Sequence, residues 1–232
     1  MFNVLIECLR FAYIFLEIIL KYATRPFLLF KDFYEERRKL SLRIPNHIAV
    51  LYTEQSAICM EMLSDLILHC VSVGIKKISI YDPWSFVASN KDLLARKATV
   101  KVSKVNPKLV SFIHFVTKMD ILQSDVSGLA VILLGKDSGR ETLVSVCRKM
   151  CVIHNPSAIT VGKIGKAFAD ENVFEPDYLL RIGSVKSMAG FPSWALRLTE
   201  IISIKRLKGR MTQDYFLALL NDYSNRDIRR GQ

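Results

Sequence analysis

The chain has 232 residues, enough for one domain or a compact pair with a sizeable buried core, so disorder is not the default. Half of its residues are hydrophobic and its mean hydropathy is +0.22, which favours a membrane or a permanent partner. The net charge of +11 favours polyanionic partners such as nucleic acid, anionic lipid or phosphorylated ligands. Five scattered cysteines, an odd number, argue against a disulfide scaffold and favour a reducing, cytosolic location.

Residues 1–30 are strongly apolar and predict one amphipathic helix, whose periodicity ends at Pro26. No uninterrupted run of about twenty apolar residues occurs, so a simple single-pass span is not assured. The polar side chains share one narrow stripe, and opposite charges lie three or four residues apart: Asn3, Glu7, Arg10, Glu17 and Lys21. We predict that this helix anchors the chain to a membrane, either spanning it or lying in its interface. The alternative is a helix docked on the core of this protein or of a partner.

Residues 31–43 form a basic linker after that helix. Its cations are Lys31, Arg37, Arg38, Lys39 and Arg43. Such a juxtamembrane excess holds the following domain on the cytosolic side. A cleaved secretory signal is not expected, because acids and bases are interspersed and no small-residue cleavage site follows.

From residue 44 onward, short β-branched runs alternate with helical segments. We expect strands at 47–52, 77–81, 99–103, 128–134, 178–182 and 201–205. Expected helices cover residues 56–73, 83–96, 138–152, 158–170, 192–199 and 212–223, the third of them opened by a Ser138–Glu141 capping box. This alternation predicts one α/β domain, residues 44–232, built around a mostly parallel sheet with no second domain.

Three local motifs have competing interpretations. Residues 135–140 follow a strand and precede a helix, the context in which backbone amides cradle phosphate, but they lack Walker spacing; a turn plus capping box is the simpler interpretation. Residues 162–165 read Gly-Lys-Ile-Gly, similar to RNA-binding loops, yet they lie within helical periodicity, so no nucleic-acid partner is expected. Cys147, Cys151 and His154 share a helix face, where a buried thiol face is favoured over a metal site.

Three further segments carry a resemblance. Residues 45–51 read PNHIAVL; residues 176–181 (PDYLLR) lead to GFPSW at 190–194 and TEI at 199–201; residues 229–231 read Arg-Arg-Gly. In this order they resemble motifs of the cis-prenyltransferase family, whose members condense isopentenyl diphosphate onto an allylic diphosphate. The resemblance implies the undecaprenyl diphosphate synthase-like fold, a central mostly parallel sheet flanked by helices.

The departures from that family concern its diphosphate site. In catalytic members the first strand leads into Met-Asp-Gly-Asn-Gly-Arg, whose aspartate serves Mg²⁺ and diphosphate; here Thr53 stands at the aspartate and Ala57 at the arginine. Arg181 is kept, but the second arginine of the following motif falls on Ser187. The resemblance therefore implies a vestigial pocket with no catalytic residue or metal of its own. Its members are Thr53, Glu54, Arg181 and Glu200, the last with an expected structural role.

This combination resembles the Nogo-B receptor type of subunit within the family. The resemblance implies a heterodimer, or a higher assembly, with a catalytic cis-prenyltransferase chain at the endoplasmic reticulum membrane, forming dehydrodolichyl diphosphate synthase for dolichol and protein glycosylation. Mg²⁺ would be held mainly by the partner. Arg229 and Gly231 would contact the substrate diphosphates, isopentenyl and allylic, in trans, with Arg230 adding positive charge. The alternatives are a membrane scaffold or receptor-like protein without a catalytic role and a self-sufficient homodimeric enzyme, which Thr53 and Ser187 disfavour.

Overall fold

The computed structural model describes residues 42–117, 120, 127–152, 156–205, 207 and 209–226. The predicted anchor at 1–30, the linker at 31–43 apart from its last two residues, and the Arg-Arg-Gly motif at 229–231 lie outside the described residues. The chain divides into two compact units, Met1–Leu42 and Arg43–Gln232, and the fold below is that of the second. Among the described residues no helix has both the length and the hydropathy needed to cross a membrane.

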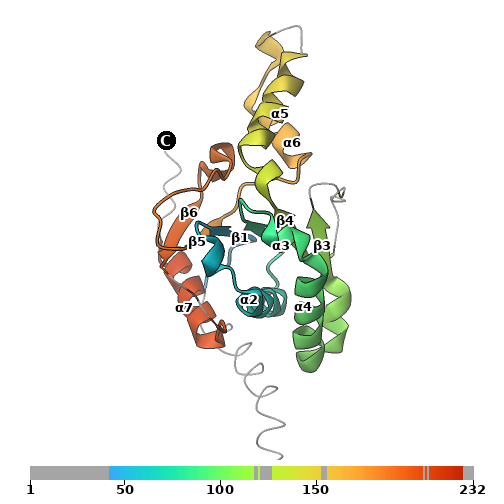
Figure 1. Cartoon of the computed structure of the whole chain (residues 1–232), viewed down its shortest axis with the longest axis vertical. Helices are drawn as coiled ribbons and strands as arrows, with labels where there is room; N and C mark the ends of the chain where they lie inside the picture. Colours follow the sequence, from blue (N-terminus) through green and yellow to red (C-terminus); the bar gives the residue numbers. More distant parts are fainter. Residues whose placement is uncertain are drawn as a thin grey trace, which may run out of the picture. The chain divides into compact units, whose positions relative to one another are not determined.

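A six-stranded sheet lies at the centre of this unit (Figure 1), with strand order β3-β4-β2-β1-β5-β6. All five neighbouring pairs are parallel, as expected from the alternation of strands and helices. The strands are β1 (His47–Tyr52), β2 (Lys77–Tyr81), β3 (Ile113–Thr117), β4 (Leu129–Leu134), β5 (Tyr178–Ile182) and β6 (Glu200–Ile204).

Helices cover both faces of the sheet. In Figure 1, α2 lies between α4 and α7 on one side, while α5 and α6 lie on the other. The helices are α2 (Met60–Val73), α3 (Phe86–Ser89), α4 (Lys91–Val105), α5 (Arg140–Cys151), α6 (Val161–Ala169) and α7 (Gln213–Ser224). Short 3₁₀ turns are η1 (Gln55–Ala57), η2 (Pro107–Phe112), η3 (Lys136–Ser138), η4 (Pro156–Ala158) and η5 (Ser193–Leu196).

The central strands are apolar because both of their faces are buried. Every residue of β1 and of β4 is buried, which confirms the interior position expected for the continuous apolar run at 128–134. Alternate residues serve opposite faces: Ala49 and Leu51 of β1 belong to a cluster that also contains Phe168 of α6. The helix that follows β1 ends where expected, at Gly74, whose φ of +83° suits the left-handed cap and whose N–H donates to the Cys70 carbonyl.

The predicted strand at 99–103 is wrong, because these residues lie inside α4. The alternation Thr-Val-Lys-Val is typical of a strand, but Leu94, Ala98 and Val102 are fully buried at four-residue spacing, which is the period of a helix packed on its neighbours. The strand that completes this side of the sheet, β3, was not predicted. It is an edge strand in which only Val116 is buried, so its pattern of buried residues is weak.

Two helix starts also differ from expectation. Residues 83–96 do not form one helix: Ser85 has a φ of +56°, and the Asp82 carboxylate instead caps the short helix α3 by accepting hydrogen bonds from the Phe86 and Val87 amides, both 2.9 Å. The prediction of a Ser138–Glu141 capping box is also wrong. Ser138 ends the turn η3, and α5 begins after Gly139 without any side-chain cap.

The thiols of α5 also lie differently from the prediction. Cys147 and Cys151 are exposed, so they do not form the expected buried thiol face, and His154 lies outside the described residues. Residues 162–165 do lie inside a helix, α6, as their periodicity indicates.

Candidate functional site

The carboxyl ends of β1 and β5 lie side by side at the point where the chain changes direction across the sheet. From β1 the chain continues to β2 on one side, whereas from β5 it continues to β6 on the other. In open parallel sheets the crevice at such a switch point is the usual ligand site. Thr53 directly follows β1 and Gly183 directly follows β5, so the residues expected at a diphosphate pocket lie at this edge.

Thr53 is turned into the protein backbone. Its N–H and its hydroxyl both donate to the Ile182 carbonyl oxygen, at 2.9 and 3.3 Å, and only 9% of the residue is exposed. Gly183 packs directly against it: a Cβ at Gly183 would lie 2.1 Å from Thr53 Oγ1. The position that would carry a carboxylate in catalytic cis-prenyltransferases therefore carries a neutral hydroxyl that is already satisfied by the backbone.

Glu54 is engaged by the opposite loop. Its Oε1 accepts hydrogen bonds from the Ser184 amide, at 2.8 Å, and from the Ser184 hydroxyl. The Glu54 carboxylate accepts both hydrogen bonds and so connects the end of β1 to the loop that follows β5. The next turn, η1, buries Ala57, so the loop offers no cation at the position of the lost arginine.

Arg181 lies on β5 and is half-buried. Its Nη2 donates to Ser203 Oγ of β6 at 2.6 Å, across a register pair of the sheet. Ser187, which stands at the position of the second arginine, accepts a hydrogen bond from the Ala189 amide at 3.1 Å. Of the two arginines expected to bind a diphosphate, only Arg181 is therefore present, and its guanidinium bonds to Ser203 on the neighbouring strand β6.

Glu200 does not join the other predicted site residues. It begins β6, at the amino edge of the sheet, whereas Thr53, Glu54 and Arg181 lie at or near the carboxyl edge. Its carboxylate accepts from Arg226 Nη1 at 3.3 Å, so its contact is that of a structural ion pair.

Arg226 and Arg43 hold the end of α7 at this amino edge. Arg226 donates to the Asp222 carboxylate at 2.9 Å and to the Ile201 carbonyl at 3.1 Å. Arg43 donates through Nη2 to the carbonyl oxygens of Tyr223 and Arg226, both at 3.0 Å, and its guanidinium lies 4.6 Å from the Tyr223 ring centroid. The point at which the chain leaves α7 is therefore tied to the first residues of the domain and to β6.

Comparisons with known proteins agree with this geometry. No family model matches the chain. The chain is 26% identical over 186 residues to the mouse protein named dehydrodolichyl diphosphate synthase complex subunit Nus1, covering 76% of this chain and 63% of that protein. It is also 26% identical over 223 residues to the fission yeast (Schizosaccharomyces pombe) subunit nus1, covering 87% and 82%. A probable undecaprenyl diphosphate synthase from Campylobacter jejuni shares the fold, with a TM-score of 0.62 and 15% identity over 82% of this chain and all of that one.

The chain is thus similar over most of its length to proteins of the cis-prenyltransferase family, and within that family to the Nus1 type of subunit. It spans somewhat less than two thirds of the length of the mouse relative. The parallel sheet confirms the undecaprenyl diphosphate synthase-like fold expected from the motifs.

The Mg²⁺ of that family does not fit the residues of this chain. Thr53 supplies no carboxylate, the Glu54 carboxylate accepts from Ser184, and the Asp82 carboxylate is used by backbone amides of the loop that follows it. Within the described part of the chain no three His, Cys, Asp or Glu side chains gather closely enough to hold a metal ion. No step of prenyl transfer is therefore assigned to a metal at this edge.

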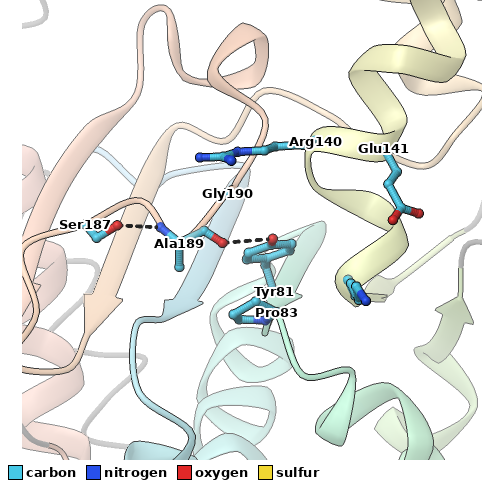
Figure 2. A pocket seen from close by; sticks show the side chains of 8 residues that line it. Tyr81, Pro83, Arg140, Glu141, Ser187, Ala189 and Gly190 are labelled. Atoms are coloured by element: carbon cyan, nitrogen blue, oxygen red, sulfur yellow. Dashed lines mark hydrogen bonds between the residues drawn. The ribbon is translucent and has the colours of Figure 1, made fainter.

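A second part of the same edge was not predicted as a site. A cavity of about 420 Å³ lies between the start of α5 and the loop after β5. Figure 2 shows Arg140 extending from α5 toward the loop that carries Ser187. The sequence contained one indication of this cavity, the loop at 135–140, whose position between a strand and a helix is typical of phosphate-binding loops.

Proposed function

We propose that this chain is a non-catalytic but activity-essential subunit of a dehydrodolichyl diphosphate synthase complex. In that complex a catalytic cis-prenyltransferase chain holds Mg²⁺ and adds isopentenyl diphosphate units to an allylic diphosphate, making polyprenyl diphosphate for dolichol and protein glycosylation. The relatives named as subunits of that complex support the assignment. The observation that carries it is Thr53, whose hydroxyl bonds to the Ile182 carbonyl at the position of the family's aspartate.

The residues proposed to act are Arg229 and Gly231, which would contact the substrate diphosphates in the partner's active site, with Arg230 adding positive charge. A fork-shaped guanidinium matches the geometry of phosphate oxygens, and a glycine lets a backbone amide approach phosphate without a Cβ clash. Loss of a diphosphate leaving group develops negative charge, which such donors stabilise in the transition state.

The position of α7 supports action in trans rather than in this chain's own pocket. Arg226 is fixed at the amino edge of β6 by Glu200 and Ile201. Gly231 follows five residues later, so even a fully extended chain carries it at most roughly 18 Å. The carboxyl edge lies about 15 Å away along the strands alone, since each residue rises about 3.3 Å. Only a fully stretched segment lying along the sheet would reach Thr53.

We further propose that residues 1–30 anchor this subunit to the endoplasmic reticulum membrane, with the main domain in the cytosol. The apolar helix, its thin polar seam and the basic residues at 31–43 support this arrangement. A polyprenyl product is itself apolar, so synthesis beside a bilayer gives the product an apolar phase to enter.

The first test is a prenyl-transfer assay with labelled isopentenyl diphosphate, farnesyl diphosphate and Mg²⁺. It compares this chain alone, its catalytic partner alone, and the two co-expressed. We expect long polyprenyl diphosphate chiefly from the pair. If the pair makes no more product than the partner alone, the subunit assignment is wrong and the scaffold alternative takes its place.

The tail prediction concerns Arg229→Ala and Gly231→Ala in the co-expressed complex. Each should lower turnover by about tenfold or more. Arg229→Ala removes a charge-assisted contact to the diphosphate, and Gly231→Ala adds a Cβ where the backbone amide would approach the diphosphate. Lys104→Ala removes a cation from the exposed end of α4 and serves as the matched control. Heterodimer content, measured by co-purification, should be unchanged in all three; normal turnover in both tail variants would contradict action in trans.

A further inference from the structure

The amino edge of the sheet, where the parallel strands begin, carries a row of exposed residues. The residues that directly precede β3, β4, β2 and β1, in the order of the strands, are Phe112, Gly128, Lys76 and Asn46, and all of them are exposed. The Lys76 amide donates to the Asn46 carbonyl oxygen at 3.0 Å, and a Cβ at Gly128 would lie 2.2 Å from the Phe112 carbonyl oxygen, so neighbours in the row are in contact. Strands in a sheet are about 4.8 Å apart, which places the backbones of Phe112 and Lys76 roughly 10 Å from each other.

The turn η2 places a second lysine, Lys108, at this edge, because η2 leads directly into β3. The turn is held by its own polar side chains. The Asn106 side chain accepts a hydrogen bond from the Lys108 amide at 3.1 Å, and the Ser111 hydroxyl donates to the Lys108 carbonyl oxygen at 3.0 Å. Within the described residues, neither the Lys76 nor the Lys108 ammonium group forms a salt bridge.

Acidic side chains are missing from the described segments that form this part of the edge, which are residues 42–46, 74–77, 105–112 and 127–128. The acid that precedes the next strand along the edge, Asp177 before β5, is used by the chain itself. Its carboxylate accepts hydrogen bonds from the amides of Asn46 and His47, at 2.8 and 3.0 Å. The charges of Lys76 and Lys108 therefore have no acidic neighbour in these segments, which makes the edge attractive to a polyanion.

Phe112 adds an apolar group to these cations. The residue is 42% exposed, although a phenyl ring gains most when it is buried. Its backbone packs closely on Gly128, so the ring is presented from a tightly packed part of the edge. An aromatic ring beside lysines is typical of a surface that lies in a membrane interface, because the ring enters the headgroup region while the ammonium groups contact anionic headgroups.

The preceding part of the chain enters the domain at the same edge. The domain begins at Arg43, four residues before β1. The basic linker at 31–43 spans at most roughly 45 Å when fully extended, so an anchor formed by residues 1–30 would keep this edge within that distance of a bilayer. Such a tether makes contact with the membrane intramolecular, and a contact that is weak by itself, through two lysines and one ring, then becomes effective.

We propose that the amino edge of the sheet is a second membrane contact, made by the folded domain. Lys76 and Lys108 contact the headgroups of anionic phospholipids, and Phe112 enters the interface of the bilayer. The inference deepens the proposed function and rests on the membrane anchoring in it. It also gives the domain an orientation, with the amino edge toward the lipid and the carboxyl edge, which carries the candidate site, toward the cytosol.

The test uses the purified full chain with the substitution Phe112→Trp, which adds a fluorescent indole at the proposed contact. The vesicles contain phosphatidylcholine with brominated acyl chains, either alone or mixed with phosphatidylserine, and bromine quenches an indole that reaches the bilayer. The unaltered chain, which contains Trp84 and Trp194, gives the background to be subtracted. We expect the added fluorescence to be quenched strongly on the mixed vesicles and weakly on the neutral ones.

Lysine variants made in the Phe112→Trp chain show whether the contact is specific. Lys76→Gln and Lys108→Gln should each lower the ratio of quenched to unquenched indole about fivefold, the effect expected for one lysine at an anionic membrane surface. Lys186→Gln is the matched control: it removes an exposed cation from the loop after β5, at the opposite edge, and should change nothing. An equal loss in the Lys186 variant would show attraction to net charge and overturn the proposal. Equal quenching on neutral and mixed vesicles would overturn the role of the two lysines.

Flotation of the same samples separates this proposal from anchoring by residues 1–30. Neutral vesicles should retain the chain through the anchor alone, so retention on both kinds of vesicle without quenching would contradict the second contact and leave the anchor standing. Retention by mixed vesicles only, lost in the two lysine variants, would contradict the anchor and support the contact.

Hydrogen exchange of the amides at 108–112 tests a protein as the occupant of this edge. We expect these amides to exchange more slowly on mixed vesicles than on neutral ones. Slower exchange caused by the catalytic partner chain, in the absence of vesicles, would assign the edge to a protein contact and overturn the proposal.

Discussion

At the scale of single residues, the carboxyl edge of the sheet is defined by pairs of groups that satisfy each other. Thr53 bonds to the Ile182 carbonyl oxygen and packs on Gly183, while Glu54 accepts from Ser184. These contacts join the ends of β1 and β5 at the positions where catalytic relatives of the family bind diphosphate. In this chain the polar groups at these positions therefore bond to one another rather than remaining open to a ligand.

Gly183 is the residue on which this closure depends. Its φ of +135° is strained for any side chain, and a Cβ would meet Thr53 Oγ1 at 2.1 Å, so Gly183→Ala should lower the free energy of unfolding by roughly 2–4 kcal/mol. Gly165→Ala is the matched control, because Gly165 lies in α6, where an added methyl group would meet nothing within 4 Å. Replacing a helical glycine by alanine should stabilise by up to about 1 kcal/mol. Urea denaturation measures the free energy of unfolding of both variants. If Gly183→Ala is as stable as the unaltered chain, the proposed clash is refuted.

At the scale of elements, the end of α7 is held by ionic contacts and hydrogen bonds to neighbouring strands. Tyr178 of β5 donates to Asp222 at 3.0 Å, and Asp222 also accepts from Arg226. Burial, followed by the hydrogen bond to Asp222, raises the pKa of Tyr178 above its usual range, so the phenol stays protonated and remains a donor. Asp222 and Arg226 together therefore connect the end of α7 to β5 and β6.

Arg226→Ala should loosen this end of α7. The partly exposed network is screened by water, so the expected loss of stability is about 1 kcal/mol. Hydrogen exchange of the amides at 221–225 should accelerate more than that of α2, because local opening of the helix end needs less energy than global unfolding. Arg148→Ala, on an exposed face of α5, should change neither rate. Unaltered exchange at the end of α7 in the Arg226 variant would show that Arg43 alone holds it.

At the scale of the whole molecule, the buried His47 links three segments that are distant in sequence. Its Nδ1–H donates to the Glu175 carbonyl oxygen at 3.2 Å, so in the neutral ring Nε2 accepts from Ser79 Oγ at 2.8 Å. Burial is the main cause that lowers the pKa of His47 to about 4. The neutral imidazole thus joins β1, β2 and the chain before β5.

Because the pKa of His47 falls from 6.5 in the unfolded chain to about 4 in the folded one, acid should destabilise the fold. The unfolded chain binds a proton first, so stability is fully present above pH 6.5 and declines as the pH falls toward 4. The loss between pH 7 and pH 5 should be roughly 2 kcal/mol from this residue. Burial also lowers the pKa of His69, which acts in the same direction.

Urea titrations at pH 7, 6 and 5 measure this effect. These pH values lie above the range in which the described carboxylates with lowered pKa values titrate. One of these carboxylates is Glu61, whose pKa is lowered to about 2 by Lys97 and Lys101. His47→Gln should be less stable at pH 7 but should show a smaller decline toward pH 5, with His69 accounting for the remainder. An unchanged decline would exclude His47 as a source of the pH dependence.

Much of the fold could be predicted from local pattern. The strands at 47–52, 77–81 and 178–182 agree residue for residue with the structure, because a fully buried parallel strand reads as a short continuous apolar run between turn residues. The segment at 99–103 could not be predicted, since its β-branched residues are compatible with a strand and only packing of Leu94, Ala98 and Val102 makes it helical.

The class of the domain, the resemblance to the cis-prenyltransferase family and the threonine at the aspartate position could all be inferred from the sequence, because residue identity at a motif position needs no coordinates. Tertiary structure alone decided which residues share a site. It separated Glu200 from Thr53 by the length of a strand, and it placed Lys136 and Arg140 beside Ser187, about fifty residues away in sequence. Parallel strands bring their carboxyl ends to one edge whatever their order in the chain, so proximity depends on topology rather than on spacing.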